Sequence, residues 1–109
     1  MSTTPVEDRI RLKLDKAFNP TTLNIANDSA SHAHHTAMAG SVSKETHFRV
    51  LITSDDFLMK TQPARHRMVY TVLNDELKKE GGIHALQLKT QTIGEEQILW
   101  RKARAEGAV

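Results

Sequence analysis

The stretch HFRVLIT, residues 47–53, alternates side chains in the way that is typical of a β-strand with one buried face. The alternation puts Phe48, Val50 and Ile52 on one side and mostly polar side chains on the other. A similar, shorter alternation over Thr22–Ala26 predicts a strand earlier in the chain. These two runs predict that part of the protein is a small sheet.

Between these strands lies the polar segment NDSASHAHHTAMAGSVS, residues 27–43, which contains His32, His34 and His35. Imidazole is the commonest metal ligand near neutral pH, so this loop is a candidate ligand loop. The alternative is a loop that is only polar and solvated. There is no HExxH or Cys/His spacing to indicate a self-contained zinc site. We expect the rest of the chain to hold this loop near His84 and present both to a partner.

The remaining segments read mainly as helices. Apolar residues at helical spacing predict a helix over Pro5–Phe18, with Thr4 and Glu7 as a capping box. A second helix is expected over Pro63–Lys79 and a third strand over His84–Thr90. The remaining expected elements are a last short helix that begins after Thr92, with a capping box to Glu95, and a basic tail over residues 101–109.

The resulting order, α-β-β-α-β-α, predicts an α+β fold in which helices cover one face of a three-stranded sheet. Because a helix joins the second and third strands, these two strands are expected to lie parallel. The 109 residues are enough for one domain, with a core over about residues 5–100.

Composition narrows the function. The chain is 39% hydrophobic and 26% charged, which is typical of a soluble globular protein, and no apolar run approaches the length of a bilayer span. No signal peptide is recognisable. There are no cysteines, so a bound iron or zinc ion would need imidazole or carboxylate ligands from this chain. The net charge of +2 permits an acidic or nucleic-acid partner without indicating one.

Two further places carry candidate residues. His84 is in phase with Leu86 and Leu88, so strand alternation predicts a partly buried histidine, although its place at the strand edge leaves room for exposure. Arg65 and Arg67 flank His66 in the first turn of a predicted helix, where cations oppose the helix dipole. They are expected to meet either an anion on a partner or an internal carboxylate. No catalytic motif is present, and we expect no enzymatic activity.

Four short strings resemble motifs of the BolA family, in the family's order, between about Pro5 and Glu96. They are NDSASHA, KETHFRV, ARHRMVY and GGIHALQLKTQT. The chain resembles the eukaryotic branch that carries histidine in the first loop. It departs from the family at Asp28, where glutamate is usual, and at Phe57-Leu58-Met59, which lacks the usual glycine. It also departs at its ending, where Trp100 is displaced.

The resemblance implies a BolA fold, similar to a class II KH domain. It also implies an iron–sulfur assembly or trafficking factor that binds a monothiol glutaredoxin and shares a bridging 2Fe-2S cluster, held also by glutathione. By motif position the metal ligands would be His32 and His84, with His34 or His35 as substitutes. Arg65 and Arg67 would then contact the partner.

The same resemblance implies a heterodimer when the cluster is bound and a monomer without it. The mitochondrial matrix is the expected compartment, with cytosol, nucleus or plastid as alternatives. The alternative function is a nucleic-acid-binding transcriptional or stress regulator with a KH-like surface, or a nuclease. KH recognition depends on a GxxG loop, and this sequence has no GxxG.

Overall fold

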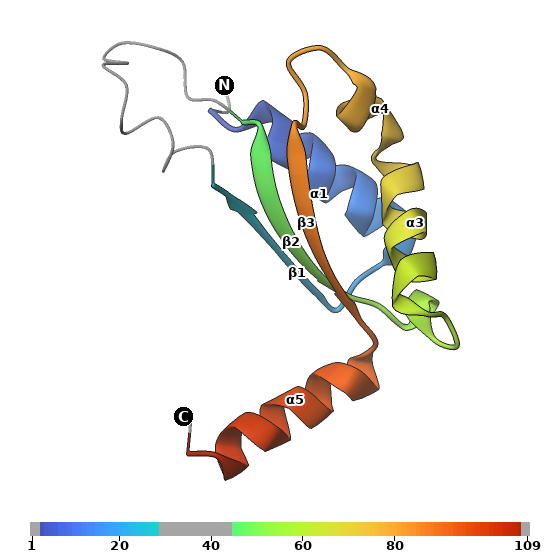
Figure 1. The fold of residues 1–109 in the computed structure, drawn as a ribbon, viewed down its shortest axis with the longest axis vertical. Helices are drawn as coiled ribbons and strands as arrows, with labels where there is room; N and C mark the ends of the chain where they lie inside the picture. The colour runs from blue at the N-terminus through green and yellow to red at the C-terminus, as the bar shows by residue number, and fades with distance from the viewer. Residues whose placement is uncertain (1–2, 29–44, 108–109) are drawn as a thin grey trace.

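The structure, a computed structural model, describes residues 3–28 and 45–107, and its elements follow the predicted order (Figure 1). The first part holds α1 (Pro5–Phe18) and β1 (Thr22–Asn27). The second part comprises β2 (His47–Thr53), the 3-10 turn η1 (Asp55–Phe57), α3 (Gln62–Val72), α4 (Asn74–Lys78), β3 (Ala85–Gln91) and α5 (Ile93–Ala105). The predicted α+β class is confirmed.

The sheet has the strand order β1-β2-β3. Strands β1 and β2 are antiparallel, and β2 and β3 are parallel, as predicted, with Phe48 beside Leu86 and Thr53 beside Gln91. Because the parallel strands run together in register, the starts of β2 and β3 lie side by side at one end of the sheet. Their ends meet at the other end.

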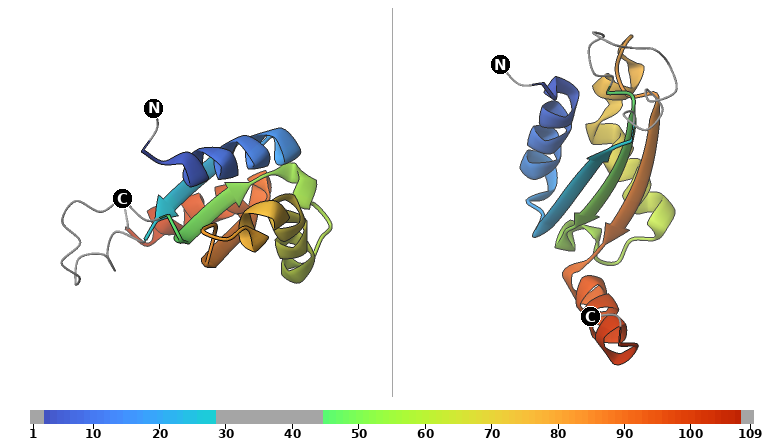
Figure 2. Two further views of the ribbon diagram at one scale, coloured as in Figure 1. Left: turned by 90° about the horizontal axis from the view of Figure 1, so that it is seen from above. Right: turned by 90° about the vertical axis from the view of Figure 1, so that its left-hand side faces the viewer.

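The core lies between one face of the sheet and the helices α1, α3 and α4. Its buried side chains are Val6, Ile10, Leu14, Phe18, Phe48, Val50, Ile52, Phe57, Val69, Leu73 and Ile83. The alternation predicted for β2 is therefore confirmed. The opposite face of the sheet carries exposed Asn24, Arg49, Gln87 and Lys89. Helix α5 buries no side chain and extends away from the end of the sheet (Figure 2).

The prediction of one helix over Pro63–Lys79 is wrong. The helix begins at Gln62 and breaks at Leu73, whose φ of -95° and ψ of 9° lie outside helical geometry while its side chain is fully buried. Beyond the break, the buried Glu76 accepts hydrogen bonds from Arg9 Nε at 2.9 Å and Lys13 Nζ at 2.7 Å. The break in the helix thus coincides with contacts that α4 makes with the core and with α1. Helical periodicity in the sequence alone does not predict this break.

The two predicted capping boxes differ in outcome. That of Thr92 and Glu95 is present at the start of α5. That of Thr4 and Glu7 is absent, because the carboxylate of Glu45 accepts the N–H groups at the start of α1 instead. Helix α5 runs to Ala105, so Arg101, Lys102 and Arg104 lie on a helix rather than in a tail. None of the described helices has both the length and the apolar character needed to cross a bilayer.

Candidate functional site

The starts of β2 and β3 bring two histidines together. His47 opens β2 and is paired in register with Ala85, the first residue of β3. The carbonyl oxygen of Thr46 accepts hydrogen bonds from the N–H groups of His84, at 2.8 Å, and of Ala85, at 3.0 Å. These bonds fix the backbone of His84 directly before β3 and beside His47.

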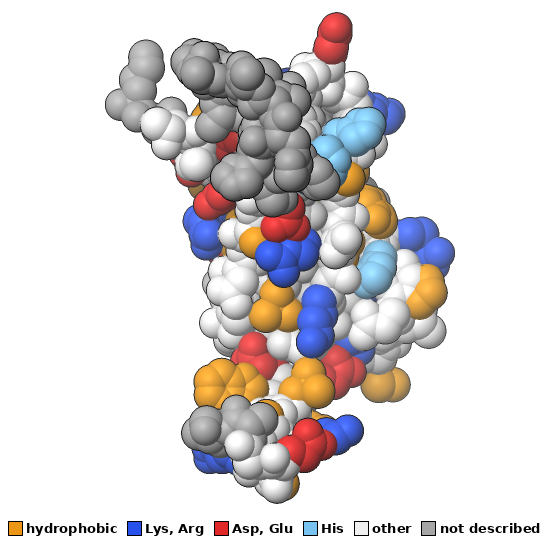
Figure 3. Space-filling view, turned by 60° about the vertical axis from the view of Figure 1, so that its left-hand side comes forward, with side chains coloured by type: hydrophobic (Ala, Val, Ile, Leu, Met, Phe, Trp, Pro, Cys, Tyr) orange, Lys and Arg blue, Asp and Glu red, His pale blue; other side chains and the backbone are white. Residues whose placement is uncertain are grey.

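The rings of His47 and His84 lie with their centroids 5.4 Å apart and their planes inclined by 51°. Thr46 Oγ1 lies 2.9 Å from Nδ1 of His47. His84 is exposed and His47 is half-buried. Figure 3 shows that histidine side chains reach the surface on this face of the molecule. The expectation of a partly buried His84 is wrong, because β3 begins one residue later and strand alternation does not extend to His84.

Two consecutive glycines, Gly81 and Gly82, form the turn that precedes His84. Gly81 has a φ of +77°, a conformation that side chains disfavour. At Gly82 a Cβ atom would lie 2.2 Å from the carbonyl oxygen of Glu76, so no larger residue fits without movement of the backbone. That same oxygen accepts a hydrogen bond from the N–H of the buried Ile83 at 2.9 Å. The turn is therefore tightly held, and it positions His84 directly before the start of β3.

The chain leaves the sheet for the segment 29–44 at the same end of the sheet, after β1. The N–H of Asp28 donates to the carbonyl oxygen of His47 at 2.8 Å. Its carboxylate accepts two hydrogen bonds from Arg49, at 2.7 Å from Nε and 3.1 Å from Nη2. This ion pair is largely exposed, so its contribution is to geometry more than to stability. Asp28 is thus held through both its backbone N–H and its carboxylate.

The chain returns at Glu45, which is buried. Its two carboxylate oxygens accept the N–H groups of Val6, at 3.1 Å, and Glu7, at 3.0 Å. A carboxylate is favoured at this place because the first N–H groups of a helix have no partner within it and carry partial positive charge. Sequence reasoning missed Glu45, since its partners lie about forty residues away and no local motif links them.

The loop histidines His32, His34 and His35, three of the predicted ligands or substitutes, lie outside the described residues. Of the predicted ligands, the structure therefore places His84 alone, next to a histidine that was not among the candidates. Within residues 3–28 and 45–107, no group of three or more His, Cys, Asp or Glu side chains is placed to hold a metal ion.

Arg65 lies at the opposite end of β3 and is buried. Its guanidinium donates to both carboxylate oxygens of Glu95, at 2.6 Å and 3.0 Å, and its Nε donates to the carbonyl oxygen of Lys60 at 2.9 Å. The side-chain hydrogen bond from Arg65, with the N–H of Thr92, lowers the pKa of Glu95 to about 2. The prediction that Arg65 contacts a partner is therefore not supported, because the internal carboxylate already engages it. Arg67 is exposed and remains a predicted contact.

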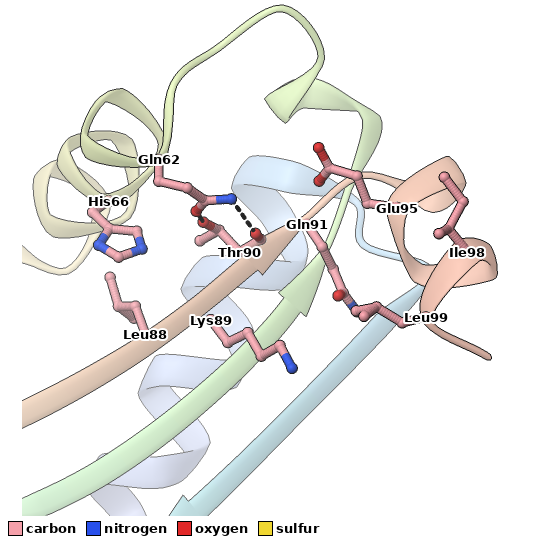
Figure 4. A pocket seen from close by; sticks show the side chains of 9 residues that line it. All are labelled: Gln62, His66, Leu88, Lys89, Thr90, Gln91, Glu95, Ile98 and Leu99. Atoms are coloured by element: carbon pink, nitrogen blue, oxygen red, sulfur yellow. Dashed lines mark hydrogen bonds between the residues drawn. The ribbon is translucent and has the colours of Figure 1, made fainter. Parts of the chain in front are cut away.

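A pocket of about 490 Å³ lies between α3, β3 and the start of α5 (Figure 4). His66 and Leu88 are among its lining residues, and Gln62 exchanges hydrogen bonds with Thr90 across its wall, at 2.6 Å and 3.1 Å. Its contacts tie α3 to β3.

Comparison with known proteins identifies the chain. A family model described as BolA-like protein matches residues 14–95. The chain belongs to the BolA family. The solved structure of BolA1 from Arabidopsis thaliana has a TM-score of 0.70 at 41% identity, over 81% of this chain and 92% of that one.

Two relatives of this chain have names that indicate different roles. SufE-like protein 1, chloroplastic/mitochondrial, of Arabidopsis thaliana is 44% identical over 89 residues, 80% of this chain but 24% of that protein. The DNA-binding transcriptional regulator BolA of Escherichia coli (strain K12) is 40% identical over 90 residues, 83% of this chain and 78% of that protein. Organellar names therefore occur among its relatives.

Proposed function

We propose that this chain is a non-enzymatic iron–sulfur cluster assembly or trafficking factor. It would bind a monothiol glutaredoxin and share a bridging 2Fe-2S cluster, with His32 and His84 as its own ligands. The observation that carries this proposal is the exposed imidazole of His84, which lies at the end of the sheet where the chain leaves at Asp28 and returns at Glu45.

The chemistry of the chain agrees with such a role. Without cysteine, it can join a cluster through neutral imidazoles but not through thiolates. The thiolates would come from the glutaredoxin cysteine and glutathione. Histidine in place of thiolate raises the reduction potential of a 2Fe-2S centre, as in Rieske proteins. The two polypeptides would then bind the cluster as a heterodimer, and the cluster would be cargo rather than a resident cofactor.

Three further parts of the proposal concern the surroundings of the cluster. His34 or His35 would substitute if His32 is not the loop ligand. The exposed Arg67 would contact an acidic partner surface or the carboxylates of glutathione. We place the protein in the mitochondrial matrix, a compartment consistent with the organellar name of SufE-like protein 1.

The test is a titration of the chain into a reconstituted glutaredoxin–cluster complex, followed by visible absorption and circular dichroism. The wild-type chain should change the cluster spectrum and saturate at one chain per cluster. His84→Ala and His32→Ala should each alter that spectrum or speed cluster loss. His66→Ala is the matched control, because His66 lines the pocket at the other end of β3. Spectra of His84→Ala and His32→Ala identical to the wild type would disprove this ligand set.

The second candidate is nucleic-acid binding, which is suggested only by the name of the Escherichia coli relative. The absence of a GxxG motif and the internal engagement of Arg65 argue against a KH-like mode. If phosphate contacts exist, gel retardation at low salt should weaken steeply as salt rises and should weaken further in Arg67→Ala. No retardation at low salt would remove this candidate.

A further inference from the structure

The rings of His47 and His84 are separated by a distance that suits one tetrahedral metal ion. A metal–nitrogen bond of about 2.1 Å, plus roughly 1.1 Å from nitrogen to ring centre, puts each centroid about 3.2 Å from the ion. At a tetrahedral angle the two centroids would then be about 5 Å apart. The observed separation is 5.4 Å, with the planes inclined by 51°. The centroid separation is therefore close to the one that two imidazoles on a single ion require.

The backbone under these rings is fixed before any metal arrives. His47 stands in the β2–β3 ladder opposite Ala85, and the N–H of His84 is bonded to the carbonyl oxygen of Thr46. Since both backbones are held, metal binding would order little additional backbone.

The side chain of Thr46 adds a second feature of metal-binding histidines. Its Oγ1 lies 2.9 Å from Nδ1 of His47. A hydrogen-bond partner on one ring nitrogen fixes the tautomer and orientation of a ligating imidazole. In the tautomer whose Nδ1–H donates to this hydroxyl, Nε2 of His47 has the lone pair that an ion would take.

We propose that His47 and His84 together bind one divalent first-row transition-metal ion in the chain without its partner. Imidazole suits Zn²⁺ and Cu²⁺. Within the described residues no third His, Cys, Asp or Glu joins the pair, so water or an external donor completes the coordination. This site does not depend on the cluster proposal, in which His84 acts with a second polypeptide.

The experiment separates this pair from the other histidines. In the full chain carrying His32→Ala, His34→Ala and His35→Ala, calorimetric titration with ZnCl₂ should still show one ion bound per chain. Adding His47→Ala or His84→Ala should weaken binding at least about 10-fold, whereas adding His66→Ala should leave it unchanged. Circular dichroism checks that each variant is folded. Electron paramagnetic resonance with one equivalent of CuCl₂ should show coupling to two imidazole nitrogens.

Two results would overturn the proposal. One is loss of Zn²⁺ binding in the triple loop variant, which would assign the ion to the loop histidines. The other is unchanged affinity when His47 is replaced in that background. Thr46→Val, which keeps both imidazoles, should weaken binding about 10-fold through the lost orientation of His47. Because glutaredoxin is absent throughout, failure here would not be confused with failure of the cluster assay.

Discussion

The two ends of β3 carry polar clusters of opposite character. At its start, His84 is exposed beside the half-buried His47. At its end, Arg65 is buried, and its charged group is already paired with Glu95. The strand therefore has an open end at His84, where polar side chains face solvent, and a closed end at Arg65 and Glu95, where polar side chains bind each other. Burial and internal pairing, rather than residue type, distinguish a candidate binding site from a structural ion pair.

The closed end extends beyond one ion pair. Glu96 accepts hydrogen bonds from the hydroxyl of Thr53, at 2.8 Å, and from that of Thr22, at 3.2 Å. The amide of the buried Gln91 donates to the Thr53 hydroxyl at 3.0 Å. Helix α5 buries no side chain. These contacts, the Arg65–Glu95 pair and the hydrogen bond from the N–H of Ile93 to Asp55 together tie its first turn to the sheet, to α3 and to η1. This end of β3 thus serves the fold.

Arg65→Ala should have the largest effect on stability. The variant removes the hydrogen bonds to Glu95 and Lys60 and leaves a gap in a buried region, so unfolding free energy should fall by about 3 kcal/mol. Urea denaturation followed by circular dichroism measures it. Arg67→Ala, two residues away and exposed, should change stability by less than about 0.5 kcal/mol. Equal losses in both variants would contradict the structural role given to Arg65.

Gly82→Ala tests the open end in the same way. The added methyl group would collide with the carbonyl oxygen of Glu76, and relief requires the turn before His84 to move. We expect a loss of about 2 kcal/mol. Gly94→Ala is the control, since a Cβ there meets no atom within 4 Å, and alanine favours the helix. In spectra of isotope-labelled protein, Gly82→Ala should shift the amide signals of His84 and Ala85. Unshifted signals would show that the turn does not position the histidine.

The pH dependence of stability tests the closed end. In the folded state the pKa of Glu95 lies near 2, below its ordinary value of 4.5, chiefly because of the hydrogen bond from Arg65. Its ionisation therefore stabilises the fold above about pH 4.5, and this contribution is lost as the pH falls towards 2. Its side chain is 45% exposed, so solvent screening reduces the effect at pH 7 to about 1 kcal/mol.

The matched variant isolates that carboxylate. Glu95→Gln should be less stable than the wild type at pH 7, and the difference in urea denaturation should shrink steadily below pH 4.5. Glu106→Gln, a change near the far end of α5, should follow the wild type at every pH. A constant difference between Glu95→Gln and the wild type across this range would assign the loss to packing rather than charge.

The sequence alone predicts most of the helices and strands and one of the two ends of β3. The predictions that are wrong have specific physical causes. Periodicity located the strands because alternation in β2 depends on local burial, and helix α1 was bounded correctly by its apolar stripe. His47 and His84 each stand at the start of a strand predicted to be parallel to the other. The predicted strand order was therefore enough to predict that these two histidines lie close together.

The remaining failures come from contacts distant in sequence. Arg65 has its carboxylate thirty residues away, in α5, so spacing alone could not choose between an internal partner and an external one. The capping of α1 by Glu45 was missed for the same reason, since Val6 lies 39 residues away from it. The break at Leu73 was missed because the apolar repeat continues through it. Local patterns predicted elements, whereas polar partners required the tertiary fold.

Met59→Gly should have the smallest effect, and it should stabilise. Met59 is fully exposed with a φ of +64°, a left-handed conformation that glycine adopts without strain. A left-handed conformation costs a side-chain-bearing residue about 1 kcal/mol, but glycine also increases the entropy of the unfolded chain. We expect a net gain of about 0.5 kcal/mol.

The neighbouring residue provides the control for this turn. Leu58 has an ordinary φ of -56°, so Leu58→Gly should only destabilise. Because the carbonyl oxygen of Lys60, the next residue after Met59, accepts the Nε–H of Arg65, relaxing the turn should affect the closed end of β3 alone. The thermal midpoint should therefore rise in Met59→Gly while Zn²⁺ binding at the open end stays as in the wild type. A rise accompanied by altered metal affinity would mean that the two ends are coupled, and their separation into a structural and a binding end would fail.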